Sequence, residues 1–331
     1  MSKDTTKKGD IQEKNLFSFS DVLPDKKIQV DFNAPDLSSN GGLVLVGLMK
    51  ESIARKVARL IPDHRNQLFV QHSYEEMVCQ RVGQIMCGYE DANDCDRLRH
   101  DSALKMSVGR KASDPDLCSQ PTMTRLENHL DKKTLWAIAE LFVKDYMSSF
   151  DKAPRKIILD VDDTNANTYG AQQLSLFNDY YDEYSKSWTY KQRIIAKIQV
   201  TDKGVNIRFI VTSNRNNKPE TVYQRYCKRG TMELWIKDLK YFRADRMSCS
   251  SFKANMFRLF LYGAAYVTAY RLKSKAFSNT EVEVFTMDSF MKRIMLSAVF
   301  ITEKKTFVRF SFSPHHRHLE AISQALTSLS A

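Results

Sequence analysis

The chain has 331 residues, of which 43% are hydrophobic and 27% are charged, and this composition excludes an intrinsically disordered protein. Its formal net charge of +11 is unevenly distributed. Residues 1–185 contain 24 Lys and Arg against 29 Asp and Glu, whereas residues 186–275 contain 20 against 5. A basic segment of this kind indicates a polyanionic partner such as nucleic acid, although a basic surface without a partner remains the alternative.

The sequence shows no feature of an exported or membrane-bound protein. Its first residues lack the apolar core of a secretory signal, and the longest apolar stretch, Met256 to Tyr270, is too short to cross a bilayer. The six cysteines include no C-x-x-C pair, so neither a disulfide framework nor a zinc site is expected. We therefore expect a cytoplasmic, nucleoid-associated protein with reduced thiols and no membrane partner.

The first 150 residues favour helices. A polar arm and a turn at Leu37–Gly42 lead into a long segment, up to about Ser149, in which apolar side chains recur every three to five positions. This spacing is typical of helices that bury one face. Asn128 and Asp131 are both suited to cap the helix that follows them.

After Pro154 the hydrophobic period changes. The almost wholly apolar run Lys156–Asp162 is typical of a buried central strand. Five further elements are predicted from apolar periodicity and turn residues. They are a hairpin around Asp202–Gly204, helices from Pro219 to about Phe242 and from about Ser251 to Lys273, a second hairpin around Glu303–Lys305, and a short helix from His315.

Several carboxylates stand where the Lys156–Asp162 strand ends, namely Asp160, Asp162 and Asp163. Such a cluster is costly unless a cation or hydrogen bonds compensate it. Because oxygen ligands suit Mg²⁺ or Mn²⁺, the cluster is a candidate metal site. A solvated turn that caps the next helix is the alternative reading of the same residues.

One family with this pattern is the haloacid-dehalogenase-like phosphatases, whose nucleophile motif the strand resembles. In that interpretation Asp160 attacks phosphorus and Asp162 acts as acid and base, and Phe209–Asn214 resembles the family's phosphate-holding strand. The later acidic pair that such enzymes need to hold Mg²⁺ is not recognisable in the sequence, and this interpretation explains nothing in residues 1–150.

The predicted helix after Pro219 carries a spaced set of polar residues, Tyr226, Arg229, Glu233 and Lys240. At about 100° per residue, their offsets place all four within a sector of roughly 60° on one helix face. One acid and two cations on a common face can hold a metal and bind DNA phosphates together. An ordinary surface ion-pair face is the alternative.

These four residues match the signature Tyr-x2-Arg-x3-Glu-x6-Lys, and with the carboxylate strand they resemble the DDE transposases of bacterial insertion sequences. Longer polar motifs make the chain similar to the IS-four-like superfamily, in particular to its branch numbered thirteen-eighty. The segments that carry this similarity are Ala34–Gly42, Gly88–Asp101, Ser119–Asn128, Leu159–Gln172 and the tail from about Arg293.

The resemblance implies a ribonuclease-H-like α/β core and a site for Mg²⁺ or Mn²⁺. It implies Asp162 as first catalytic carboxylate, with Asp160 as the alternative, and Glu233 as the last; Asp162 and Glu233 would be the metal ligands. Tyr226, Arg229 and Lys240 would bind DNA phosphates. The implied partners are the terminal inverted repeats of the element, as double-stranded DNA, and a second copy of the chain or an intact transposase.

In such a protein the expected regions are a mainly helical DNA-end-binding part at 1–150, a truncated catalytic core at 151–275, and a hairpin with a helix at 276–331. The core is expected to be truncated because the family's second Asp, on a strand between the first Asp and the Glu, has no counterpart here. The sequence passes from Asn178–Tyr184 directly to Ser187–Tyr190, which resembles a much later family segment. An internal deletion near Ser185 accounts for this, and it predicts a transposase with defective chemistry or a non-catalytic DNA-binding remnant.

Two smaller features have ordinary explanations. His315, His316 and His318 could suggest a metal, but a helix N-terminus at the surface is the favoured interpretation. Trp188 and Trp235 could stack on bases, but packing in the core or in an interface is expected instead.

Overall fold

The computed structural model describes residues 17–23, 26–30, 34, 36–49, 52–155, 157, 167–168, 193–201 and 204–330. Helices dominate this part of the chain, and its sheets have two or three strands. The protein is therefore of mixed α and β structure, as the sequence predicts at this level. The predicted strand that carries Asp160 and Asp162 lies outside the described residues.

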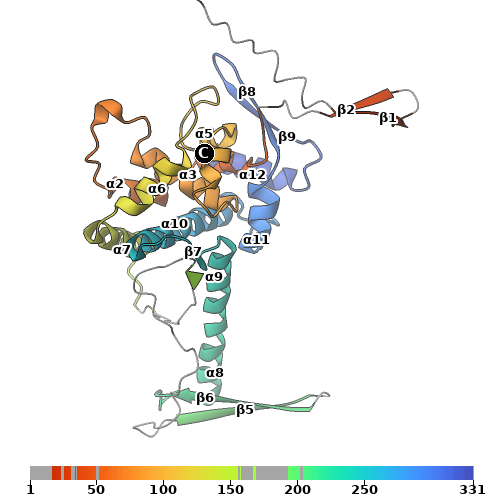
Figure 1. The fold of residues 1–331 in the computed structure, drawn as a ribbon. Helices are drawn as coiled ribbons and strands as arrows, with labels where there is room; N and C mark the ends of the chain where they lie inside the picture. The colour runs from red at the N-terminus through yellow and green to blue at the C-terminus, as the bar shows by residue number, and fades with distance from the viewer. Residues whose placement is uncertain are drawn as a thin grey trace, which may run out of the picture.

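Most helices form one body around a common apolar core (Figure 1). As predicted, the N-terminal part is helical, and polar side chains fix where its helices begin: Ser73, Asp101 and Asp131 each accept a hydrogen bond from a backbone N–H in the first turn of the next helix. The helices of this part are α1 (Gly42–Gly47), α2 (Ile53–Arg59), η2 (Gln67–Phe69), α3 (Tyr74–Met86), α4 (Asp94–Leu98), α5 (Ser102–Ser107), α6 (Gln120–His129) and α7 (Lys132–Met147).

The body is completed by the C-terminal third of the chain. The predicted apolar helix is α10 (Phe252–Arg271), which packs against α2, α3, α6 and α7. It continues into the π-helical η3 (Leu272–Ala276) and is followed by α11 (Met287–Phe290), η4 (Met291–Met295) and α12 (Leu319–Ser330). The expected helix after His315 therefore begins four residues later, at Leu319.

A small antiparallel sheet joins the two ends of the described chain. The second predicted hairpin is confirmed as β8 (Val299–Glu303) and β9 (Val308–Phe312). The short β3 (Leu37–Ser38), in the segment expected to be only a turn, pairs with β8. The remaining strands are β1 (Phe17–Leu23) paired with β2 (Lys26–Val30), and β4 (Asn167–Thr168) paired in parallel with β7 (Arg246–Met247).

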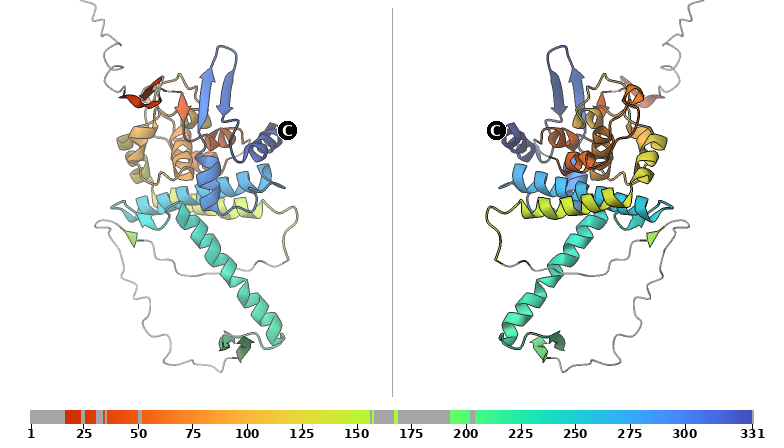
Figure 2. Two further views of the ribbon diagram at one scale, coloured as in Figure 1. Left: turned by 90° about the vertical axis from the view of Figure 1, so that its right-hand side faces the viewer. Right: turned by 90° about the vertical axis from the view of Figure 1, so that its left-hand side faces the viewer.

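An arm projects from this body (Figures 1 and 2). It consists of α8 (Pro219–Cys227) and α9 (Arg229–Tyr241), which follow one another with only Lys228 between them, and Lys228 keeps right-handed helical angles. The C-terminal part of the arm contacts α10 and α11. Its far end carries the first predicted hairpin, confirmed as β5 (Arg193–Thr201) and β6 (Gly204–Thr212).

The hairpin is attached to the arm by one apolar contact. Ile195 and Ile210 are buried against Val222 of α8, and Tyr223 packs beside them. The ammonium of Lys197 lies 3.0 Å from the hydroxyl of Tyr223 and above its ring. These contacts involve one face of the hairpin only.

Candidate functional site

The spaced polar residues of the Pro219–Phe242 segment lie along the arm. Tyr226 belongs to α8, whereas Glu233 and Lys240 belong to α9, and all three side chains are exposed. Lys228 keeps right-handed helical angles between the two helices, and Tyr226 and Glu233 line the same hollow. The side chain of Arg229 lies outside the described residues, although its backbone begins α9.

Two of these residues share a hollow of about 620 Å³ between the arm and β6. Its lining includes Tyr226 and Glu233 from the arm and Arg208 from the strand. A carboxylate, a phenol and a guanidinium therefore meet at one concave surface. A carboxylate there can be a ligand for a hard cation, and the guanidinium suits a phosphate oxygen.

The other predicted metal ligands, Asp162 and its alternative Asp160, lie outside the described residues, so their distance from Glu233 is not part of this structure. Within the described part of the chain, no three His, Cys, Asp or Glu side chains form a group that could hold a metal. Glu233 alone, exposed and approached by Arg208, fits as one oxygen ligand of Mg²⁺ but does not make a metal centre.

A second arrangement of polar residues, which sequence reasoning missed, lies inside the body. The guanidinium of Arg81 on α3 is buried and donates to Oε1 of Glu127 at 3.0 Å and to the carbonyl of Tyr89 at 3.0 Å. Arg258 on α10 is also buried, with Nε 3.8 Å from Oε2 of the same Glu127. Glu127 thus pairs with two buried cations, and Arg258 has a second carboxylate partner in Asp91, at 3.8 Å.

The carbonyl oxygen of Glu90 is the centre of this buried network. It accepts hydrogen bonds from Arg81, from Arg258 at 2.9 Å and from the hydroxyl of Tyr262 at 3.2 Å. Burial alone would lower the pKa of Arg258, but Glu127 and other neighbours raise it above the ordinary value. The Gly88–Asp101 and Ser119–Asn128 segments therefore hold three helices together, which is a structural role.

The other polar motifs meet nearby, at Asp101. Its carboxylate accepts from the backbone N–H of Leu104 at 2.8 Å, from the hydroxyl of Ser38 at 2.7 Å and from the amide of Asn40 at 3.2 Å. The turn that follows Asn40 approaches the C-terminal third closely, because the N–H of Gly41 donates to the carbonyl of Ser297 at 2.8 Å. The long motifs at Ala34–Gly42, Gly88–Asp101 and Ser119–Asn128 thus belong to one body.

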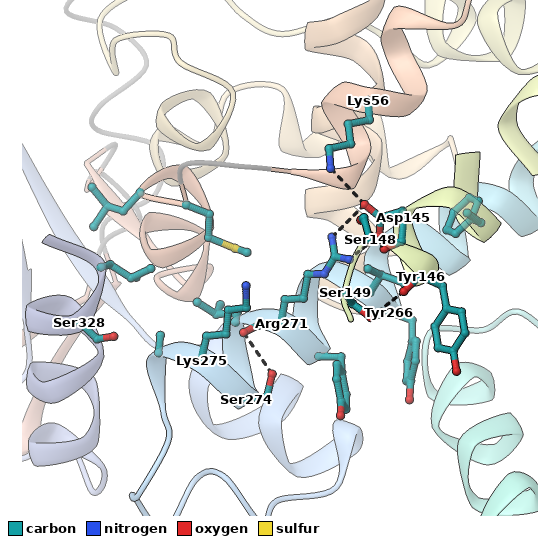
Figure 3. A pocket seen from close by; sticks show the side chains of 18 residues that line it. Lys56, Asp145, Tyr146, Ser148, Ser149, Tyr266, Arg271, Ser274, Lys275 and Ser328 are labelled. Atoms are coloured by element: carbon teal, nitrogen blue, oxygen red, sulfur yellow. Dashed lines mark hydrogen bonds and ion pairs between the residues drawn. The ribbon is translucent and has the colours of Figure 1, made fainter. Parts of the chain in front are cut away.

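A pocket of about 890 Å³ in this body is lined mainly by α7, α10, η3 and the end of α12 (Figure 3). At its edge Asp145 is buried and forms ion pairs with Lys56, at 3.1 Å, and with Arg271. Burial by itself would raise the pKa of Asp145, but hydrogen bonds from Arg271 and Lys56 hold this pKa below its ordinary value. Two of the cations at this pocket, Lys56 and Arg271, therefore already have a carboxylate partner.

A family model described as transposase DDE domain group 1 matches residues 20–186 and 184–331. The chain belongs to this family of DDE transposases. The predicted resemblance is thereby confirmed at the level of the family, and the motifs at Gly88–Asp101 and Ser119–Asn128 are structural features of this transposase's body. Comparison with curated proteins and with solved structures gave no match.

Three minor predictions can also be compared with the structure of the transposase. All six cysteines are free thiols, and burial raises the pKa of Cys79 and Cys95 to about 11. Trp235 is exposed on the arm, so it does not pack in the core, and Trp188 lies outside the described residues. His318 precedes α12 but is buried, with Nδ1 3.0 Å from Glu281, so only part of the histidine cluster is at the surface.

Among the described residues, none of the helices combines the length and the apolar character that a membrane span needs.

Proposed function

We propose that this transposase binds DNA but lacks the complete carboxylate set for DNA cleavage and strand transfer. The observation that carries the proposal is the division of the family match into two segments, 20–186 and 184–331, which meet without intervening sequence. An internal deletion near Ser185 produces such a division. The missing part is the one in which the family's second Asp is expected, so the core is an incomplete ribonuclease-H-like fold.

The regions of the chain then have the following roles. Residues 1–150 bind the ends of a bacterial insertion sequence, residues 151–275 are the truncated catalytic core, and residues 276–331 complete the body. In the core, Asp162 is the first carboxylate, with Asp160 as its alternative, and Glu233 is the last. When bound, Mg²⁺ or Mn²⁺ would activate the attacking oxygen and stabilise the leaving oxygen.

The remaining residues of the chain cannot perform this chemistry alone. Asp162 and Glu233 supply two of the three carboxylates that hold paired metals about 4 Å apart. A misplacement of a reacting group by about 1 Å already costs on the order of a hundredfold in rate, and the absence of a bridging carboxylate disturbs the geometry more. Tyr226, Arg229 and Lys240 would still bind phosphates, because their role requires no metal.

DNA binding is supported by the distribution of charge on the arm. Cations without a nearby carboxylate favour phosphate binding and make it salt-dependent, because each phosphate contact releases about 0.9 counterion. The arm and the loop before it are rich in exposed cations and carry few acids. These cations are Arg215, Lys218, Arg225, Lys228, Lys237 and Lys240.

The proposal is tested by two assays on the purified chain. Fluorescence anisotropy with labelled inverted-repeat duplex should give a steep negative dependence of log K on log salt. Incubation of the same DNA with Mg²⁺ or Mn²⁺ should give no cleavage at the element end. A flat salt dependence would disprove the DNA-binding part of the proposal. Cleavage that disappears in Glu233→Gln would disprove the catalytic defect, and Asp202, outside the described residues, would then be re-examined as second carboxylate.

A phosphatase remains the alternative from another enzyme class, and the same preparation distinguishes it. Turnover of p-nitrophenyl phosphate that is lost in Asp160→Asn would support the phosphatase interpretation. The family match favours the transposase, since it includes residues 20–150, which the phosphatase interpretation leaves unexplained.

A further inference from the structure

The β5–β6 hairpin at the end of the arm has two faces of opposite character. Strand alternation places Ile195 and Ile210 on the face that packs against α8. The other face carries only apolar side chains at its described positions, and the large ones are 46–68% exposed. These residues are Ile194, Ala196 and Ile198 on β5, and Val205, Ile207, Phe209 and Val211 on β6.

A contiguous apolar surface of this kind indicates a partner. One face of the hairpin is already covered by α8, and exposed apolar patches of several hundred Å² mark interaction sites. Three charged residues of the two strands have described side chains, namely Arg193, Lys197 and Arg208. They alternate with the apolar residues and so lie on the face that packs against α8. DNA or an acidic peptide would find no complementary charge on the exposed face.

The surface is complementary to itself. Within the hairpin the small Ala196 lies directly opposite the large Phe209 in the register, and Ile198 lies opposite Ile207. A two-fold axis parallel to the strands places β5 of one copy over β6 of the other. Phe209 then fits above the partner's Ala196, and the partner's Phe209 fits above Ala196, as isologous contacts require.

We propose that the β5–β6 hairpins of two copies of this chain pack face to face and form a dimer. At roughly 60–120 Å² for each of the large apolar side chains, each copy contributes on the order of 500 Å². The total of about 1,000 Å² is at the lower limit of specific interfaces. The dimer is therefore weak, with a Kd in the micromolar range, and it forms without DNA.

The test is sedimentation equilibrium of the full chain, treated with nuclease and held at high salt to exclude bridging by DNA. The native chain should be dimeric at about 100 µM and dissociate on dilution. Phe209→Glu should weaken the dimer by about 30-fold or more, because it places a charge at the centre of the interface. Leu68→Glu, at an even more exposed apolar position of the body, is the control and should leave the dimer unchanged.

A swap of the two side chains tests the geometry itself. Phe209→Ala and Ala196→Phe should each weaken the dimer, because one leaves a hole and the other creates a clash. The double variant exchanges the two shapes across the two-fold axis and should restore most of the affinity. A monomeric native chain at about 100 µM, or a dimer insensitive to Phe209→Glu, overturns the proposal; a double variant no tighter than the single ones overturns the face-to-face arrangement. Far-UV circular dichroism confirms that each variant is folded.

Discussion

Nε of Arg81 lies 3.0 Å from Oε1 of Glu127, and the two side chains are only 1% and 3% exposed. The pair joins α3 to α6 inside the body, and the second oxygen of Glu127 faces Arg258 of α10. Arg81 therefore depends on Glu127 for neutralisation, whereas Arg258 shares Glu127 and also faces Asp91 at 3.8 Å. A buried charge that loses its partner is far more costly than a surface one.

We predict that Glu127→Gln destabilises the chain by about 3–5 kcal/mol, because the buried Arg81 loses its counter-charge and Arg258 keeps only Asp91, at 3.8 Å. Equilibrium urea unfolding measures the change. The matched control is Glu140→Gln, which removes the exposed ion pair with Lys144 and should cost less than about 0.5 kcal/mol. A loss below about 1 kcal/mol for Glu127→Gln would mean that the network contributes little to stability.

A second prediction concerns the close approach between the N-terminal turn and the C-terminal third. A Cβ atom on Gly42 would lie 2.4 Å from the backbone Cα of Met295, so the backbone would have to move. We expect Gly42→Ala to cost about 1–3 kcal/mol or more, as over-packed sites do. Thermal unfolding provides the measurement.

Gly263 supplies the control for this substitution. A Cβ on Gly263 in α10 would make ordinary contacts of 3.5 Å with the ring of Phe142. Because Ala is the better helix former by about 1 kcal/mol, Gly263→Ala should stabilise the body. Equal effects of the two substitutions would show that the approach at Gly42 is not tight.

The hairpins and long helices could be predicted from the sequence because their signals are local. Apolar alternation around Asp202–Gly204 identified β5 and β6, and Pro219 identified the beginning of α8. The choice between Asn128 and Asp131 as cap was left open, and the structure selects Asp131. Of the signature residues, Tyr226 and Glu233 line the same hollow, and Lys228 between their helices keeps helical angles.

The buried ion pairs, the buried histidine and the arm depend on contacts between segments that are distant in the sequence. Local hydrophobic patterns do not reveal such contacts. Arg81 and Glu127 are 46 residues apart, and each looks like a surface residue in its own helix. His318 was expected at the surface, but its ring is buried beside Glu281, which is 37 residues away. The position of the β5–β6 hairpin at the end of the arm likewise depends on contacts between separate elements, which the local sequence does not reveal. Only the resemblance of its long polar motif to a known family indicates that Gly88–Asp101 has a special role.

A third prediction separates the arm from the rest of the surface in DNA binding. The double variant Lys218→Ala and Lys228→Ala removes two exposed cations of the arm. If both contact phosphates, the slope of log K against log salt should become shallower by about 1.8, at 0.9 for each contact. Lys304→Ala with Lys305→Ala removes the same charge from the turn of the β8–β9 hairpin and should leave the slope unchanged. Equal effects of the two pairs would assign binding to net charge and not to the arm.

The last prediction concerns pH and follows from His316. Its Nδ1 accepts a hydrogen bond from the backbone N–H of His318 at 3.1 Å, and its Nε2 lies 2.9 Å from the hydroxyl of Ser297. That hydroxyl donates to the carbonyl of Ile294, so Nε2 is the donor and the ring is neutral. Burial, with a smaller contribution from His318, lowers the pKa of His316 below its ordinary value.

Because the pKa of His316 is lower in the folded chain than in the unfolded one, the unfolded state binds more protons as the pH falls below about 6.5. The contribution of the neutral ring to stability is complete above that pH and is lost as the pH falls through the folded pKa. We expect the melting temperature to fall by a few degrees between about pH 7 and pH 5, above the range in which ordinary carboxylates titrate. His316→Gln should flatten this dependence, whereas His315→Gln, at an exposed ring, should preserve it. Protonation of Nδ1 of His316 would set one donor against another, the N–H of His318. A melting temperature of the native chain that stays constant down to about pH 5 would therefore show that the hydrogen bond at Nδ1 does not require the neutral ring.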